Sequence, residues 1–186
     1  MKKLFLAIAV IASTAGIYSF TTKAADAYTV NTTTSKVEFI GSKAGGYHPG
    51  YFMLKSGSVM IDGGKLTGGS FVIDLSTLKI TDDAGAKLEG HLKSPDFLDF
   101  GKGTDAMYSI SSVKYISPTK ADIDGTLTLK GITAPVKFVA NIRGIDAAKF
   151  FAEATFSLDG TAFGVTYDPK KVATDVQVTV HLFATK

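Results

Sequence analysis

The sequence has no cysteine, no tryptophan and only five prolines. The missing cysteines exclude disulfides, thiol catalysis, thiolate metal sites and lipid attachment through a thiol. An excess of one charge sign is missing as well. Three of the 20 basic residues precede residue 24, and without them seventeen remain against 17 acidic ones. Nucleic-acid binding depends on an excess of lysine and arginine, so we predict no nucleic-acid partner.

Sequence motifs for common chemistries are also missing: there is no nucleophile elbow, phosphate-binding loop or dinucleotide fingerprint. The three histidines are His48, His91 and His181. A metal site would need them to converge, but His181 alternates with the apolar face of the last predicted strand. Asp122 and Asp124 share a face that continues to Lys130, which indicates a solvent-facing surface rather than an acid–base pair. We predict no metal, no cofactor and no catalytic residues.

The first 24 residues have the pattern of a secretory signal peptide. Lys2 and Lys3 precede an apolar run from Leu4 to Phe20, and an A-x-A cleavage pattern ends at Ala27. The run of 17 residues is interrupted by serine, threonine and glycine, and is short of the roughly 20 apolar residues of a bilayer span. We predict cleavage near residues 24–27, export to the periplasm or medium, and no stable membrane span afterwards. An uncleaved anchor is the alternative.

From Tyr28 onward, apolar residues recur with the period of two that is typical of half-buried strands. Residues 121–130 and 176–182 show it most clearly. A change of parity between Ile110 and Val113 predicts a β-bulge. Eight to ten such segments, separated by Gly- and Pro-containing turns, indicate one antiparallel sandwich or barrel domain over residues 28–186.

One segment, residues 83–92, departs from this pattern and predicts a short helix. Asp82 or Asp83 is expected to cap it, and Leu88 and Leu92 lie four residues apart on one face. Pro95 follows the helix, and Phe97 and Phe100 are expected to press onto the end of the sheet assembly. A short helix placed there would cover a barrel opening.

Several sequence blocks occur in an order that resembles the YceI family of exported, lipocalin-like, polyisoprenoid-binding proteins. They are Tyr28-Thr29-Val30, His48-Pro49-Gly50-Tyr51-Phe52, His91-Leu92-Lys93-Ser94-Pro95-Asp96-Phe97, Gly125-Thr126-Leu127-Thr128-Leu129-Lys130-Gly131 and Phe163-Gly164-Val165. The resemblance implies an all-β, extended eight-stranded antiparallel barrel. It implies long isoprenoids, quinones or fatty amphiphiles as ligands. Gly160 stands where the family commonly has an arginine, so tail binding is a firmer expectation than any particular head group.

The inward-facing residues of such a barrel are large and aromatic, and they are our candidates for a ligand tunnel. They are Phe39, Phe52, Phe71, Ile73, Phe97, Tyr108, Ile110, Leu127, Phe138, Phe156, Phe163 and Val178. His48, His91 and Lys93 are candidates for a head-group site at the mouth. Burying one CH₂ contributes about 0.8 kcal/mol and association costs about 4–15 kcal/mol. Such a tunnel therefore suits tails of about ten carbons or more.

Two alternatives remain open at the level of sequence. An eight-stranded barrel can be filled by its own side chains, which would fit a structural or stress-response interaction module. An enzyme acting on a lipid-like substrate would need an inward polar pair, for which His48, His91 and Tyr108 are the candidates. The oligomeric state is also open, with a homodimer as one possibility.

Overall fold

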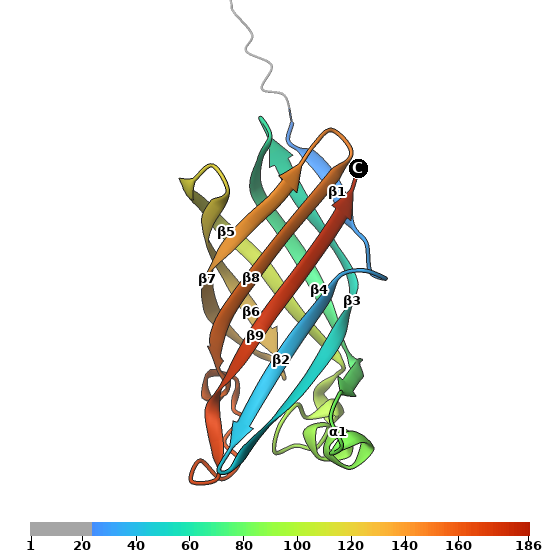
Figure 1. Ribbon diagram of the computed structural model, residues 1–186, viewed down its shortest axis with the longest axis vertical. Coiled ribbons are helices and arrows are strands. Elements are labelled where there is room, and N and C mark those ends of the chain that lie inside the picture. Colours follow the sequence, from blue (N-terminus) through green and yellow to red (C-terminus); the bar gives the residue numbers. More distant parts are fainter. Residues whose placement is uncertain (1–23) are drawn as a thin grey trace, which may run out of the picture.

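The computed structural model describes residues 24–186, so the predicted signal peptide lies, except for Ala24, outside the described residues. Nine strands and three short helices follow one another in this part of the chain (Figure 1). Their bounds are β1 (Asp26–Val30), β2 (Lys36–Lys43), β3 (Gly46–Asp62), β4 (Lys65–Ile80), α1 (Gly85–Leu92), η1 (Phe100–Lys102), β5 (Asp105–Ser117), β6 (Lys120–Leu129), β7 (Ile132–Ile145), β8 (Lys149–Asp159), η2 (Gly160–Phe163) and β9 (Val172–Thr185).

Strands β2 to β9 form a closed eight-stranded antiparallel barrel, as predicted. Each strand pairs with the next along the chain, and β2 pairs with β9 to close the cylinder. The short β1 pairs with β3 and β9 at one end. The connections between neighbours are mostly tight hairpins, which is the simplest order for a barrel without free edges.

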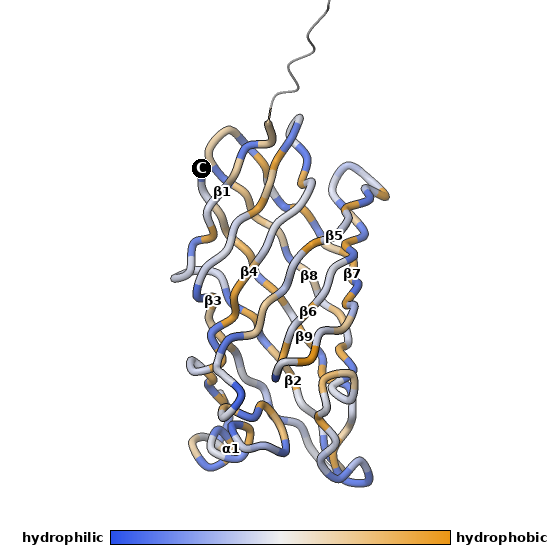
Figure 2. Tube along the Cα trace, turned by 180° about the vertical axis from the view of Figure 1, so that it is seen from behind, coloured by the Kyte–Doolittle hydropathy of each residue, from blue (hydrophilic) through white to orange (hydrophobic). Residues whose placement is uncertain are grey.

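Hydrophobic and hydrophilic residues alternate along the strands, as predicted (Figure 2). In β6, Ala121, Ile123 and Leu127 are buried while Asp122 and Asp124 lie on the outer face. The predicted bulge is present, because the pairing of β5 with β6 shifts register between Ile110 and Ser112. The period of two thus predicted correctly, along most of the barrel wall, which side chains face the interior and which face solvent.

The two ends of the barrel differ. At the end away from α1, the interior is packed by Tyr28, Val59 and Phe150, all at most 3% exposed. The Tyr28 hydroxyl donates to the Asp146 carbonyl at 2.7 Å, tying β1 across this end. The opposite end carries α1, the turn between β6 and β7, and the long connection between β8 and β9 (Figure 1). An opening can therefore exist only at the α1 end.

Helix α1 confirms the predicted short helix but begins at Gly85, two residues later than expected. Its N-cap is Ala84 and no side chain caps it, so the predicted aspartate cap is wrong. The Asp82 carboxylate instead accepts the Ala84 N–H at 3.0 Å, in a turn before the helix. Leu88 lines the barrel interior, so the helix covers the opening with its predicted apolar face.

The prediction that Lys130 lies on a solvent-facing strand face is wrong. It follows the end of β6 with a left-handed φ of 56°, so its side chain leaves the alternation of the strand. It is 8% exposed, and its ammonium donates to the Pro95 carbonyl at 3.3 Å and to the Gly164 carbonyl at 3.1 Å. Lys130 therefore joins the segment after α1 to the β8–β9 connection across the mouth.

Replacing Lys130 by methionine is expected to lower the free energy of unfolding by about 2–4 kcal/mol, because two hydrogen bonds from a charged donor are lost. The methionine keeps most of the apolar stem. Lys137→Met on the following strand is the matched control, since that exposed ammonium pairs with Asp124 at the surface and such pairs contribute about 0–1 kcal/mol. Urea denaturation measures both. Equal losses in the two variants would contradict the assigned role of Lys130.

Candidate functional site: an apolar cavity open at one end

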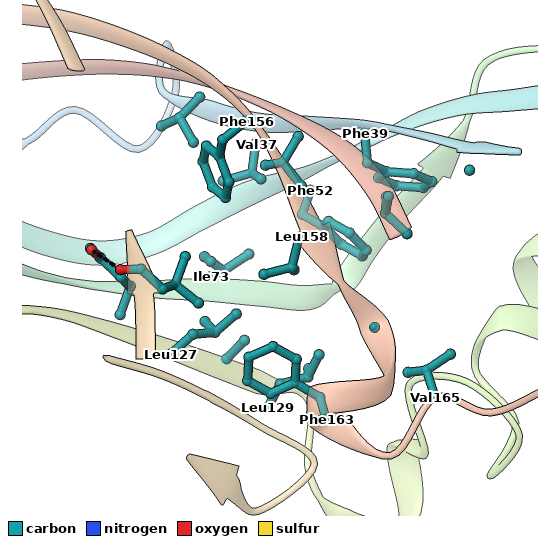
Figure 3. A pocket seen from close by; sticks show the side chains of 18 of the residues that line it. Val37, Phe39, Phe52, Ile73, Leu127, Leu129, Phe156, Leu158, Phe163 and Val165 are labelled. Atoms are coloured by element: carbon teal, nitrogen blue, oxygen red, sulfur yellow. Dashed lines mark hydrogen bonds between the residues drawn. The ribbon is translucent and has the colours of Figure 1, made fainter. Parts of the chain in front are cut away.

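A cavity of about 700 Å³ runs inside the barrel. This volume lies within the range of about 300–1,000 Å³ that is usual for small-molecule sites. All twelve predicted tunnel residues line it. Figure 3 shows Phe39, Phe52, Ile73, Leu127 and Phe156 among the side chains that surround the space. The interior is not filled, so the barrel has room for a ligand.

The aromatic side chains form part of the cavity wall. Ring centroids are 6.5 Å apart for Phe71 and Tyr108, 5.6 Å for Tyr108 and Phe138, and 4.6 Å for Phe138 and Phe156. These residues come from β4, β5, β7 and β8, and β6 lies between β5 and β7 in the barrel. The rings therefore stand side by side along one wall of the cavity.

Tyr108 brings a hydroxyl group into this wall, and its side chain is buried. Its hydroxyl donates to the Val136 carbonyl at 3.1 Å. Burial raises the pKa of the phenol well above its ordinary value of 10, with a smaller contribution from Asp124. The hydroxyl is thus protonated at neutral pH and already engaged, which makes it a poor acid or base.

Space for a ligand comes from small inward-facing residues that strand periodicity alone does not identify. Ala140, Ala152 and Ala154 are all at most 6% exposed and line the cavity. They occupy inward positions of β7 and β8, where a larger side chain would reach toward the axis. The sequence does contain a signal for this space. Some inward positions of β7 and β8 hold alanine, whereas others hold phenylalanine.

The predicted head-group residues divide at the mouth. His48 and His91 line the cavity, whereas Lys93 does not; its ammonium lies 5.8 Å from the centre of the Phe100 ring. Lys43 and Lys171, from the β2–β3 hairpin and the β8–β9 connection, line the mouth instead. Positions in connections depend on how the turns fold, so strand periodicity could not have found Lys171.

The two mouth histidines have different partners. His48 Nδ1 lies 2.8 Å from Asp82 Oδ2, joining β3 to the segment before α1. His91 packs edge-on against the rings of Phe97 and Tyr167, with centroids 5.0 and 4.9 Å away. This cluster connects α1 to the β8–β9 connection across the opening.

The third histidine, His181, lies on the outer wall between Glu38 and Glu153, as its alternation predicted. Within residues 24–186, no group of three or more His, Cys, Asp or Glu residues could hold a metal ion. The same part of the chain contains no helix that is long and apolar enough to cross a membrane.

Gly160 also lines the cavity, and its surroundings are tight. A Cβ atom at this position would lie 3.1 Å from the Thr174 carbonyl oxygen and 3.4 Å from Val165 Cβ. A longer side chain here would require β9 or Val165 to move. The local packing therefore fits glycine at this position better than the arginine that the family resemblance led us to expect.

Two carboxylates hold the α1 segment to the barrel, and their pKa values predict its response to acid. His48, as hydrogen-bond donor, lowers the pKa of Asp82 below 3.8. The Ile80 N–H, 3.0 Å from Glu89, and the Lys79 ammonium lower the pKa of Glu89 below 4.5. The folded protein thus binds these protons less tightly than the unfolded chain.

The stabilisation is therefore fully present above the unfolded-state pKa values and is lost as pH falls through the lower folded-state values. We expect the temperature at the midpoint of thermal unfolding to decrease as the pH is lowered from 5 to about 3. Circular dichroism measures this temperature. The variant Glu89→Gln, which keeps an acceptor but does not titrate, should show a smaller fall. An unchanged midpoint in the unmodified protein would contradict this account.

The geometry defines a class of protein: a closed antiparallel barrel with a hollow apolar interior that opens beside a short helix. The sequence profile of the YceI-like domain family matches residues 28–184. The chain belongs to this family, which confirms the resemblance seen in the sequence.

Individual relatives agree with this assignment. A UPF0312 protein of Pseudomonas putida is 32% identical over 121 residues, which cover 62% of this chain and 62% of that protein. A UPF0312 protein of Pseudomonas fluorescens is 31% identical over 126 residues, covering 64% of each. The chain thus spans less than two thirds of the length of these relatives.

Two solved structures have the same fold. BcnA of Burkholderia cenocepacia superposes with a TM-score of 0.73 at 22% identity, covering 84% of this chain and 99% of BcnA. A polyisoprenoid-binding domain from Saccharophagus degradans superposes with a TM-score of 0.67 at 17% identity, covering 88% of this chain and 99% of that domain. At these identities the likeness concerns the fold alone.

Proposed function

We propose that this protein binds a long-tailed amphiphilic lipid, such as a polyisoprenoid, a quinone or a fatty acid or amide, inside its barrel and carries or stores it without catalysis. The observation that carries the proposal is the apolar cavity of about 700 Å³. At about 30 Å³ per heavy atom, the volume of a water molecule in the liquid, it would hold about 20 carbon atoms. At about 0.8 kcal/mol per CH₂, burying such a tail exceeds the cost of association.

The shape and polarity of the site support a tail inside and a head group outside. The deep wall consists of side chains such as Phe71, Phe138 and Phe156, whereas the titratable groups His48, Lys43 and Lys171 lie at the mouth. The polyisoprenoid-binding domain from Saccharophagus degradans has the same fold. Both observations favour a tail-binding role of the same general kind for this chain.

A binding role without chemistry is favoured because Tyr108 and His48, two of the three inward polar candidates, already have hydrogen-bond partners within the protein. Tyr108 is engaged with the Val136 carbonyl, and His48 is paired with Asp82. The signal-peptide pattern of residues 1–24 supports action outside the cytoplasm, where a water-insoluble lipid would need a carrier between membranes or a store.

A chain-length series tests the proposal. The protein would be delipidated and titrated with saturated fatty acids of increasing length, with calorimetry below their micellar concentrations. We expect the affinity to rise about fourfold for each added carbon, the equivalent of about 0.8 kcal/mol, and to level off near about 20 carbons, when the cavity is full. An affinity independent of tail length would overturn tail binding.

A further inference from the structure

Two connections project together beside the cavity mouth. One is the tip of the β2–β3 hairpin, residues 43–47, and the other is the β8–β9 connection at residues 166–171; we call them together the rim lobe. The Ala44 N–H donates to the Lys171 carbonyl at 2.8 Å, and Lys43 pairs with Val172 where β2 meets β9. Figure 1 shows this lobe at the lower end of the barrel, across from α1.

The rim lobe has an unusual surface for an exposed pair of turns. Tyr47 is 64% exposed and Tyr167 is 40% exposed. The lobe holds three lysines, Lys43, Lys170 and Lys171, against one acidic residue, Asp168. The Asp168 carboxylate pairs with the Lys171 ammonium at 2.8 Å. The remaining lysines, Lys43 and Lys170, give the surface of the lobe a net positive charge.

The opposite side of the mouth has the reverse charge. Residues 81–104, which contain α1, carry five acidic side chains and three lysines. The positive charge at the open end is therefore concentrated on the rim lobe, although residues 24–186 as a whole have 17 basic and 17 acidic side chains. A surface of one sign with exposed aromatic rings is complementary to a surface that is both anionic and partly apolar.

The lobe is also continuous with the cavity, because Lys43, Ala44, Tyr167 and Lys171 line the mouth. Whatever covers the lobe therefore faces the opening through which a ligand passes. Tyrosine rings are enriched at membrane–water interfaces, and lysines near an anionic membrane surface each favour binding by about fivefold. An anionic bilayer supplies both partners at once.

We propose that the rim lobe docks the protein onto the surface of a bilayer that contains anionic phospholipids, with the cavity mouth facing the membrane. The purpose of this contact rests on the proposed lipid-binding function, since a tail could then pass between bilayer and barrel with little exposure to water. The contact itself is a property of the lobe and can be measured without any bound ligand.

The test is co-sedimentation with vesicles of phosphatidylcholine and phosphatidylglycerol in equal parts, compared with pure phosphatidylcholine. The variant Tyr47→Ser/Lys170→Glu changes two lobe residues that do not line the cavity. We expect the unmodified protein to bind the anionic vesicles, more weakly at high salt. The variant should bind them at least about 25-fold more weakly, because two charge units are lost at about fivefold each.

The matched control is Lys114→Glu/Ile116→Ser, which makes the same kind of change on exposed residues of β5, toward the closed end of the barrel. This variant should keep at least half of the vesicle affinity of the unmodified protein. Equal losses in the two variants, or no binding of the unmodified protein to anionic vesicles, would overturn the docking proposal.

A fatty-acid titration in the absence of vesicles separates the two proposals. Tail binding that persists in a protein that does not dock leaves the proposed function intact. Docking without any tail binding would overturn that function instead.

Discussion

Phenylalanine in place of Ala154 is expected to weaken the binding of a long-tailed lipid by roughly 100- to 1,000-fold. Ala154 is 4% exposed, lines the cavity and is paired with Ala140 and Val180 on the neighbouring strands. The added ring would occupy cavity volume and displace about four or five tail carbons, each contributing about 0.8 kcal/mol. Calorimetric titration with a fatty acid near the optimal length measures the loss.

The control for this experiment is Thr155→Phe, because the neighbouring side chain points to the outside of the same strand and is exposed. It adds a ring of the same size without entering the cavity, so the lipid affinity should stay within about twofold of the unmodified protein. Thermal unfolding of both variants establishes that they fold. A folded Ala154→Phe variant with undiminished affinity would show that the tail does not occupy this part of the barrel.

Alanine in place of Gly125 is expected to lower the free energy of unfolding by about 2–4 kcal/mol, through overpacking and the loss of one hydrogen bond. The added Cβ would overlap the ring of Tyr108 and lie 2.5 Å from the Ser109 carbonyl oxygen. The Tyr108 ring cannot easily move, because it packs against Phe138 and its hydroxyl is bound to the Val136 carbonyl. Urea denaturation gives the change in free energy.

Gly144→Ala provides the matched comparison. Gly144 also lies in a barrel strand, but a Cβ there would meet no atom within 4 Å and its φ is not positive. This substitution should be neutral or slightly stabilising, because it restricts the unfolded chain. If the two variants lost equal stability, the cost would reflect strand glycines in general and not the close approach of Tyr108.

Much of the barrel could be predicted from the sequence, because a strand assigns each residue to a face by its parity alone. That rule placed Phe39, Phe138 and Val178 on the cavity wall and His181 outside it. The hollow interior is harder to foresee, since it depends on how the side chains of eight strands share one volume. The inward alanines Ala152 and Ala154 carry that information only once their neighbours are known.

The errors fell at the ends of strands and in connections. Lys130 adopts a left-handed conformation just after β6, so strand parity no longer applied to it. The expected cap of α1 failed because Asp82 is engaged by His48 and by the Ala84 N–H. The His48–Asp82 contact joins residues that are 34 positions apart in the sequence, and no local pattern reports such a contact.

The central claim is that the barrel holds a long lipid tail, and native mass spectrometry of the gently purified protein tests it most directly. The account predicts a fraction of molecules with a mass excess of one amphiphile with a tail of about 20 carbons. Organic extraction should remove the excess, and Ala154→Phe should reduce it or shift it to shorter tails. A protein that carries no lipid from its source and takes up none when incubated with vesicles would contradict the account.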